Sequence, residues 1–227
     1  MRQDITTIPV LEMFEPCDGC PICRMRDTLE ERVVTYITGA AMMESDVRIE
    51  TNRLGFCHTH FEQMGKMKRR LAVALIIESH LDEIMQNIEN SKPKTKSGFF
   101  ADKAAFENEE TCFVCSQIDW AMVRMIETVC RQWEHDSDFR ELYSKQPHFC
   151  MPHFNMLVKA GFEKMNKKNY AVFYESTKQI VLDYLAGLKN DVTYFTKMFD
   201  YRNAGGAGDW GSSSDSIERA IKWLTSR

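Results

Sequence analysis

Cys20-Pro21-Ile22-Cys23 is the stretch that indicates how this chain folds, because two thiols separated by two residues typically supply half of the ligands of a metal site. The same Cys-x-x-Cys pattern recurs later, and a Cys-x-x-His pattern follows each copy. The candidate ligands are Cys20, Cys23, Cys57, His60, Cys112, Cys115, Cys150 and His153. Three thiols and one imidazole complete a tetrahedral shell for Zn²⁺.

The order of these motifs predicts two zinc ions per chain, one in each half. The first site would combine the pair at Cys20 with the pair at Cys57. The second would combine the pair at Cys112 with the pair at Cys150. The metal in each half would then link the start of one helix to the start of a later one, and so stabilise a small domain.

The two halves also repeat each other in spacing. Cys112 lies 92 residues after Cys20, and Cys150 lies 93 residues after Cys57. One inserted residue in the second half explains the change of offset. The pattern indicates an internal duplication of a helical unit.

Two further cysteines leave alternatives open. Cys17 extends the first pair, so Cys17, Cys20, Cys23 and Cys57 could instead hold an iron–sulfur cluster. The second half has no third cysteine upstream of Cys112, which argues against the cluster. If no cluster forms, we interpret Cys17 as a thiol that binds no metal. We interpret Cys130 as a packing residue on an apolar helix face.

The apolar periodicity predicts an all-α fold. Helices are expected from the first cysteine pair onward, over 61–88, from about 169 to 200, and over 217–224. The dense apolar patch over 71–77 should be buried inside the protein or against a partner. Only Thr7 to Leu11 resembles a strand.

The polar and glycine-rich stretches that interrupt the helical pattern predict where the domains begin and end. We expect a first zinc-binding helical unit over 1–90, a polar linker over 91–110, a second unit over 111–200, and a loop with a C-terminal helix over 201–227. The polar and aromatic stretch from Asp200 to Trp210 could form a lid for a ligand or partner. Alternatively, the tail could pack across the repeats through Trp210 and Trp223.

Composition narrows the class of protein. The chain has 227 residues, eight cysteines, a net charge of −4 and a pI of about 5.9. This balance disfavours a general binder of nucleic acids or anionic membranes. No membrane-spanning apolar run and no signal-peptide pattern are evident, so we expect a cytoplasmic protein whose thiols stay reduced.

Other stretches resemble a known family. They are Thr7-Ile8-Pro9-Val10, Cys17-Asp18-Gly19-Cys20-Pro21-Ile22-Cys23, Glu50-Thr51-Asn52 before Gly55-Phe56-Cys57, and Phe199-Asp200-Tyr201-Arg202-Asn203 with Trp210-Gly211. They look like the domain-of-unknown-function family numbered 6062, a family of uncharacterised proteins found largely in Firmicutes. The resemblance implies a bacterial cytoplasmic setting and carries no established activity.

The sequence favours a non-catalytic interaction or regulatory protein, because a full metal shell leaves no position for substrate or water. Its partner would be an unidentified protein or small molecule. One alternative is a metal-dependent enzyme with a site between the repeats or at a labile ligand such as His60 or His153. A second is a nucleic-acid-binding regulator that uses the basic cluster from Lys66 to Arg70. A redox or metal-sensing role is a third.

Overall fold

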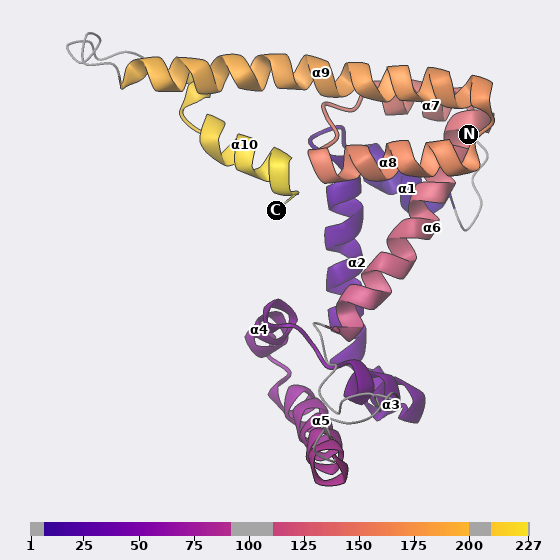
Figure 1. Ribbon diagram of the computed structural model, residues 1–227, viewed down its shortest axis with the longest axis vertical. Coiled ribbons are helices and arrows are strands. Elements are labelled where there is room, and N and C mark those ends of the chain that lie inside the picture. Colours follow the sequence, from indigo (N-terminus) through magenta and orange to yellow (C-terminus); the bar gives the residue numbers. More distant parts are fainter. Residues whose placement is uncertain (1–6, 92–110, 200–209, 227) are drawn as a thin grey trace, which may run out of the picture. The chain divides into compact units, whose positions relative to one another are not determined.

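The computed structural model describes residues 7–91, 111–199 and 210–226, and every regular element in these ranges is a helix (Figure 1). The all-α prediction is therefore confirmed. Among the described residues, no helix is both long enough and apolar enough to cross a membrane. The expected strand at Thr7 to Leu11 is wrong, because α1 (Ile8–Phe14) occupies it, with Pro9 in the first helical turn, where proline is tolerated.

The chain folds into two compact units that do not follow the order of the sequence. Unit 1 combines Met1–Arg26 with Met122–Arg227, and unit 2 is the intervening Asp27–Ala121. The helices α2 (Pro21–Ile37) and α6 (Phe113–His135) each contribute residues to both units. The units therefore differ from the two sequential halves expected over 1–90 and 111–200. The expected linker over 91–110 lies outside the described residues, except for its first residue, Ser91.

Among its described residues, unit 2 contains four helices between the later part of α2 and the start of α6. They are η1 (Ala40–Met43), α3 (Ser45–Leu54), α4 (His58–Lys66) and α5 (Arg70–Asn90). The pattern expected to run over 61–88 is thus two helices, separated by residues 67–69. The basic residues from Lys66 to Arg70 span this break, so they do not form one helical face.

Unit 1 contains the first described helix of the chain and the helices that follow α6. They are α7 (Ser137–Ser144), α8 (Met151–Lys164), α9 (Lys167–Met198), η3 (Gly211–Ser213) and α10 (Ser216–Thr225), together with α1. The Asp136 side chain caps α7 by accepting hydrogen bonds from the backbone N–H groups of Asp138 and Phe139. Asn166 caps α9 in the same way. α8 packs against α9, and α10 contacts both (Figure 1).

An aromatic cluster forms the centre of unit 1. The ring centroids of Tyr143 and Phe149 lie 4.9 Å apart, and those of Tyr143 and Phe173 lie 5.6 Å apart. Phe14 from α1 joins through Phe139, at 5.1 Å. The Tyr143 hydroxyl lies 2.7 Å from Thr177 Oγ1. Because Thr177 itself donates to the carbonyl of Phe173, Tyr143 is the donor, and the buried phenol is satisfied.

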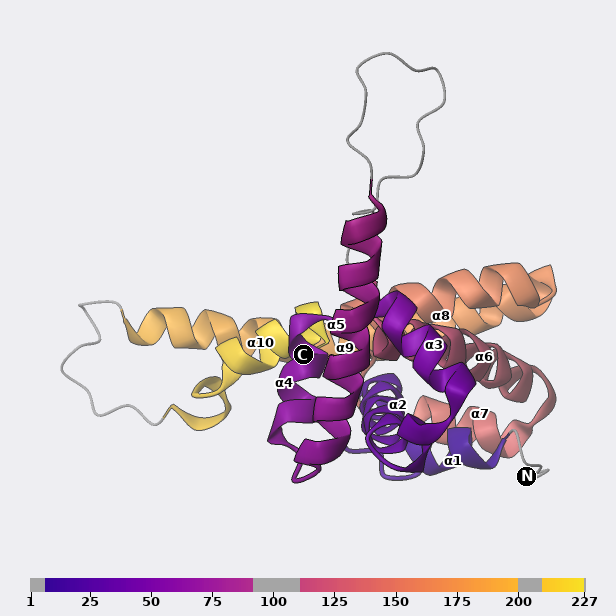
Figure 2. The same cartoon turned by 90° about the horizontal axis from the view of Figure 1, so that it is seen from below.

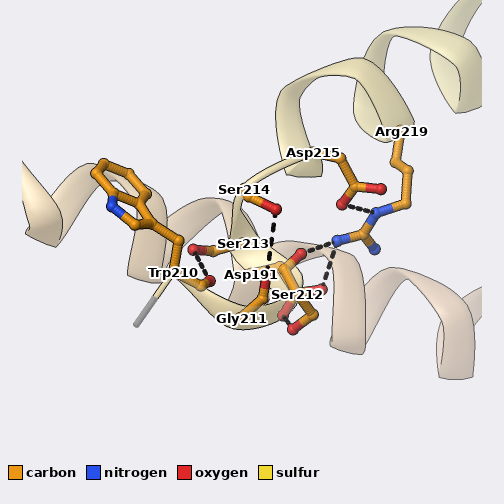
Figure 3. Close-up of polar contacts among 8 residues, drawn as sticks. All are labelled: Asp191, Trp210, Gly211, Ser212, Ser213, Ser214, Asp215 and Arg219. Carbon is orange, nitrogen blue, oxygen red and sulfur yellow. Dashed lines mark hydrogen bonds and ion pairs between the residues drawn. The ribbon is translucent and has the colours of Figure 1, made fainter. Parts of the chain in front are cut away.

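A polar network fastens the C-terminal helix to α9 (Figure 3). The Arg219 guanidinium donates to Asp191 at 2.9 Å and to Asp215 at 2.8 Å. Ser212 Oγ donates to Asp191 at 2.8 Å. Trp223 in α10 is buried and donates its indole N–H to the carbonyl of Phe149, at 3.0 Å. Trp210, at one end of the expected lid, packs against Phe195 of α9 with ring centroids 5.3 Å apart, while residues 200–209 lie outside the described residues.

Candidate metal centres

The eight predicted ligands form two clusters of four, but the clusters are not the expected ones. Site 1 consists of Cys20, Cys23, Cys150 and His153, and site 2 consists of Cys57, His60, Cys112 and Cys115. In each cluster, one donor atom from every residue lies within 4.8 Å of the other three. The predicted residues are therefore brought together, while the predicted pairing within each half is wrong. Site 1 lies in unit 1 and site 2 in unit 2.

Helix lengths agree with the pairing of each cysteine pair with the Cys-x-x-His motif of the other half. The 17 residues of α2 extend for about 26 Å, whereas the 10 residues of α3, which precede Cys57, extend for only about 15 Å. In this fold Cys57 does not return to the start of α2 and lies instead beside Cys112 and Cys115. In the second half, the 23 residues of α6 extend for about 34 Å, and the 8 residues of α7 for about 12 Å.

Hydrogen bonds also connect the segments that precede the two motifs of each site. In unit 2, the N–H of Phe113 donates to the carbonyl of Gly55 at 2.9 Å, and Thr111 Oγ1 donates to the carbonyl of Leu54 at 2.9 Å. In unit 1, Gln146 Nε2 donates to the carbonyl of Phe14 at 2.8 Å. In both units, residues in or before one motif are therefore hydrogen-bonded to residues that precede the other motif.

Gly55 is needed for the turn that leads into Cys57. Its φ of 60° lies in the left-handed region, and a Cβ there would lie 2.9 Å from His80 Nε2. His80 is fixed in place because its Nδ1 lies 2.9 Å from the carbonyl of Asn52, near the end of α3. The His80 side chain thus caps the C-terminal turn of α3.

The spacing of the donor atoms in site 1 fits a tetrahedral ion. Zn–S bonds of about 2.3 Å and Zn–N bonds of about 2.0 Å place sulfurs about 3.8 Å apart, and sulfur and nitrogen about 3.5 Å apart. Cys150 Sγ lies 3.9 Å from Cys20 Sγ and 3.6 Å from Cys23 Sγ. His153 Nδ1 lies 3.6, 3.3 and 3.0 Å from the sulfurs of Cys20, Cys23 and Cys150. Sulfurs at these distances are not disulfide-bonded.

Site 2 has the same geometry around His60 Nδ1. That nitrogen lies 3.1 Å from Cys57 Sγ, 3.2 Å from Cys112 Sγ and 3.5 Å from Cys115 Sγ. His60 and Cys112 are buried, and Cys57 and Cys115 are half-buried. Both sites therefore present a ring Nδ1 and three sulfurs around a common point.

All four motifs place their ligands at the start of a helix. The first ligand of each motif precedes the helix and accepts a backbone hydrogen bond from the residue four positions later, and the second ligand lies in the first turn. The first ligands and their donors are Cys20 with Arg24, Cys57 with Phe61, Cys112 with Ser116, and Cys150 with Phe154. Three thiolates around one divalent cation carry a net negative charge, and two helix N-termini at each site stabilise it.

In each cluster, at least one thiol favours its protonated form while no cation is present. Interaction with the neighbouring Cys20 thiol raises the pKa of Cys150 to about 12, and burial contributes to the shift. Burial, followed by the charge of Cys112, raises the pKa of Cys115 to about 12. A bound divalent ion reverses this preference, because it is the largest local charge and favours the deprotonated ligand.

Glu30 adds a contact that the sequence did not indicate. Its carboxylate Oε1 lies 2.8 Å from His60 Nε2, and both side chains are largely buried. This contact keeps the ring proton on Nε2 and leaves the Nδ1 lone pair free to bind a metal. Glu30 lies on α2, 30 residues from His60, and only the packing of α2 against α4 brings the two together.

The remaining cysteines lie outside both clusters. Cys17 Sγ donates to the carbonyl of Phe14 at 3.4 Å and accepts from Gln146 Nε2 at 3.2 Å. The iron–sulfur alternative is wrong in its ligand set, because Cys57 belongs to site 2 and Cys17 to neither site. Cys130 is buried in α6, as expected for a packing residue, and burial raises its pKa to about 12.

The histidines beside the ligands are not ligands themselves. His58 is exposed, 3.6 Å from Glu62. His148 stacks on Tyr184, with ring centroids 4.1 Å apart. Neither histidine belongs to a cluster.

Comparison with known proteins identified a family and nothing more specific. The family of unknown function DUF6062 matches residues 1–227, the whole chain, which confirms the resemblance seen in the sequence motifs. Curated proteins and solved structures gave no match.

Proposed function

The chain belongs to the family of unknown function DUF6062, and from the geometry of its two clusters we propose that it is a zinc-binding protein with two structural Cys3His sites, acting by contact rather than by catalysis. The observation that carries the proposal is the set of four protein donors in each cluster, at the spacing that a tetrahedral ion requires. Thiolate-rich tetrahedral shells select zinc or iron among the common cellular metals, and mixed Cys3His shells are typical of structural zinc.

A structural role follows from the number of ligands. Catalytic zinc keeps three protein ligands and one position for water or substrate, whereas each cluster here supplies four. The ions would hold the helix starts of each unit together. Reduced thiols of this kind suit a reducing compartment, so we place the protein in the bacterial cytoplasm.

Elemental analysis of the purified protein, combined with thiol titration, tests the proposal. We expect about two zinc ions per chain, with six thiols protected until a chelator is added. The remaining thiols, Cys17 and Cys130, should react without chelation or stay buried throughout. Protein that contains no stoichiometric metal, or iron with inorganic sulfide, contradicts the proposal.

Cobalt substitution tests the structural role separately. Co²⁺ in a shell of three thiolates and one imidazole has the intense visible absorption of tetrahedral coordination, whereas an added water gives weaker, five-coordinate bands. We expect both sites to give tetrahedral spectra that do not change with added small anions. An open fifth position at either site would favour the metal-dependent enzyme instead.

A further inference from the structure

The helix α5 has apolar side chains on two opposite faces, and only one of these faces is covered by the described residues of unit 2. The covered face consists of Ala72, Val73 and Ile76, which are buried. It continues through Ser79 and His80, which bond to Asn52 of α3. α5 contacts α3, α4 and η1 through this side.

The opposite side, here called the outer face of α5, has the spacing of a coiled coil. It consists of Leu71, Ala74, Glu78, Leu81, Met85 and Ile88, at intervals of three, four, three, four and three residues. All six are exposed, and the four large apolar side chains are 72%, 52%, 57% and 48% exposed at Leu71, Leu81, Met85 and Ile88. Such a 3–4 repeat over three heptads is what a partner helix requires. In Figure 2, the C-terminal turns of α5 extend beyond α3 and α4.

Charge along α5 identifies the partner. Lys66, Lys68, Arg69 and Arg70 lie at or just before its start. After Arg70 the helix has no lysine or arginine and carries four acidic residues, Glu78, Asp82, Glu83 and Glu89. A second α5 lying antiparallel would place its acidic end beside this basic start, and its basic start beside this acidic end.

Glu78 makes the orientation specific. In a parallel pair, the two Glu78 side chains would face each other in the same layer of the seam, which is unfavourable for like charges. In an antiparallel pair centred between Glu78 and Leu81, each Glu78 faces a leucine instead. The same register pairs Leu71 with Ile88 and Ala74 with Met85.

We propose that the outer face of α5 is the interface of a homodimer, in which two copies of this chain pair through antiparallel α5 helices. The seam is short, so the dimer is a reversible one. It does not require the metals directly, because no ligand lies on α5.

Sedimentation equilibrium on the purified, metal-analysed protein tests the proposal. The expected mass at high concentration is twice the 26.4 kDa of one chain, falling toward 26.4 kDa on dilution. Replacing Leu81→Glu together with Met85→Glu should give a monomer with an unchanged helical circular dichroism spectrum. The matched control, Val172→Glu with Leu182→Glu, changes two exposed apolar residues of α9 and should remain dimeric.

Wild-type protein that is monomeric at every concentration overturns the proposal, and means that another part of the chain or a different protein covers this face. A dimer that survives the α5 changes, or that the α9 control dissociates, also overturns it. Because the paired glutamates could disturb folding, Glu78→Leu provides a gain-of-association test. It should lower the dissociation constant by about tenfold or more, since it removes a charge from the seam, and an unchanged constant contradicts the interface.

A single charge change tests the orientation. Arg70→Glu should raise the dissociation constant several-fold, because in an antiparallel pair it removes positive charge twice from beside the acidic end of the partner helix. In a parallel pair the same change would reduce the repulsion between two basic starts and would lower the constant. A lower or unchanged dissociation constant therefore means that the antiparallel arrangement is wrong.

Discussion

Site 1 lies in a unit with several completely buried aromatic rings, whereas site 2 lies in a unit whose completely buried side chains are smaller. Among the described residues, the aromatic side chains that are completely buried all belong to unit 1: Phe14, Phe139, Tyr143, Phe149 and Phe173. The largest completely buried side chains of unit 2 are aliphatic, such as Ile37 and Met64. We therefore expect the two sets of four donors to contribute differently to stability. The core of unit 1 should persist without an ion, and unit 2 should depend on a bound ion for a larger share of its stability.

Removing both metals should have the largest effect and should separate the units. A structural zinc site contributes about 10 kcal/mol or more to folding, which is comparable to the whole stability of a domain. We expect strong chelation to abolish hydrogen-exchange protection in α3, α4 and α5, while α7 and the middle of α9 keep part of theirs. Exchange measured by mass spectrometry at increasing chelator concentration gives the order of loss.

Re-addition of Zn²⁺ should restore protection in unit 2, which serves as the control for irreversible damage. If unit 1 loses protection before unit 2, or both lose it at one chelator concentration, the contrast between the two cores is wrong.

Paired cysteine replacements test which motifs share an ion. Cys20→Ser with Cys150→Ser damages only site 1, so about one zinc per chain should remain. Cys20→Ser with Cys57→Ser damages both sites, so zinc should fall well below one per chain. The two variants each lose two thiols and are matched in every other respect, and elemental analysis measures the difference. The opposite result would restore the pairing within each half.

The sequence was sufficient to identify the eight residues of the two clusters and the helical class. Cysteine and histidine spacings of two residues are local, and each motif lies at one helix start, so their chemistry can be read without the fold. The caps at Asp136 and the proline at the start of α8 are local in the same way. The α9 and α10 boundaries came within two residues for the same reason.

The pairing of the motifs could not be read in this way, because it is a tertiary property. Deciding it required comparing the length of α2 with that of α3, and knowing that Phe113 bonds to Gly55 across a long stretch of sequence. Glu30 is equally non-local, since nothing in its neighbourhood marks it as a partner of His60. The spacing argument for an internal duplication stays a prediction. The shared geometry of the four helix starts agrees with it.

Truncating the aromatic core should affect unit 1 alone. Phe139→Ala removes a completely buried ring that contacts Phe14 and Tyr143, so we expect a loss of about 3–5 kcal/mol in the stability of unit 1. Protection in α7 and α9 should decrease, while zinc content at site 2 is unchanged. Phe162→Ala on α8 is the control, because that ring is 72% exposed and should cost about 1 kcal/mol or less. Equal effects of the two changes would mean that the core is not where the stability of unit 1 resides.

The smallest effect, and the sharpest test of the difference between the sites, is expected for Glu30→Gln. The amide keeps an oxygen near His60 Nε2 but removes the negative charge that makes the imidazole a stronger donor. Replacing an outer-shell partner of a metal ligand weakens metal binding by about 10–100-fold, which is about 1.4–2.7 kcal/mol. Competition with a chromophoric chelator should therefore become biphasic, with site 2 releasing zinc first and site 1 unchanged. Glu62→Gln, which changes an exposed carboxylate near His58, should leave both phases as in the wild type. If Glu30→Gln releases zinc from the two sites as the wild type does, the buried carboxylate supports the packing of α2 rather than the metal ligand.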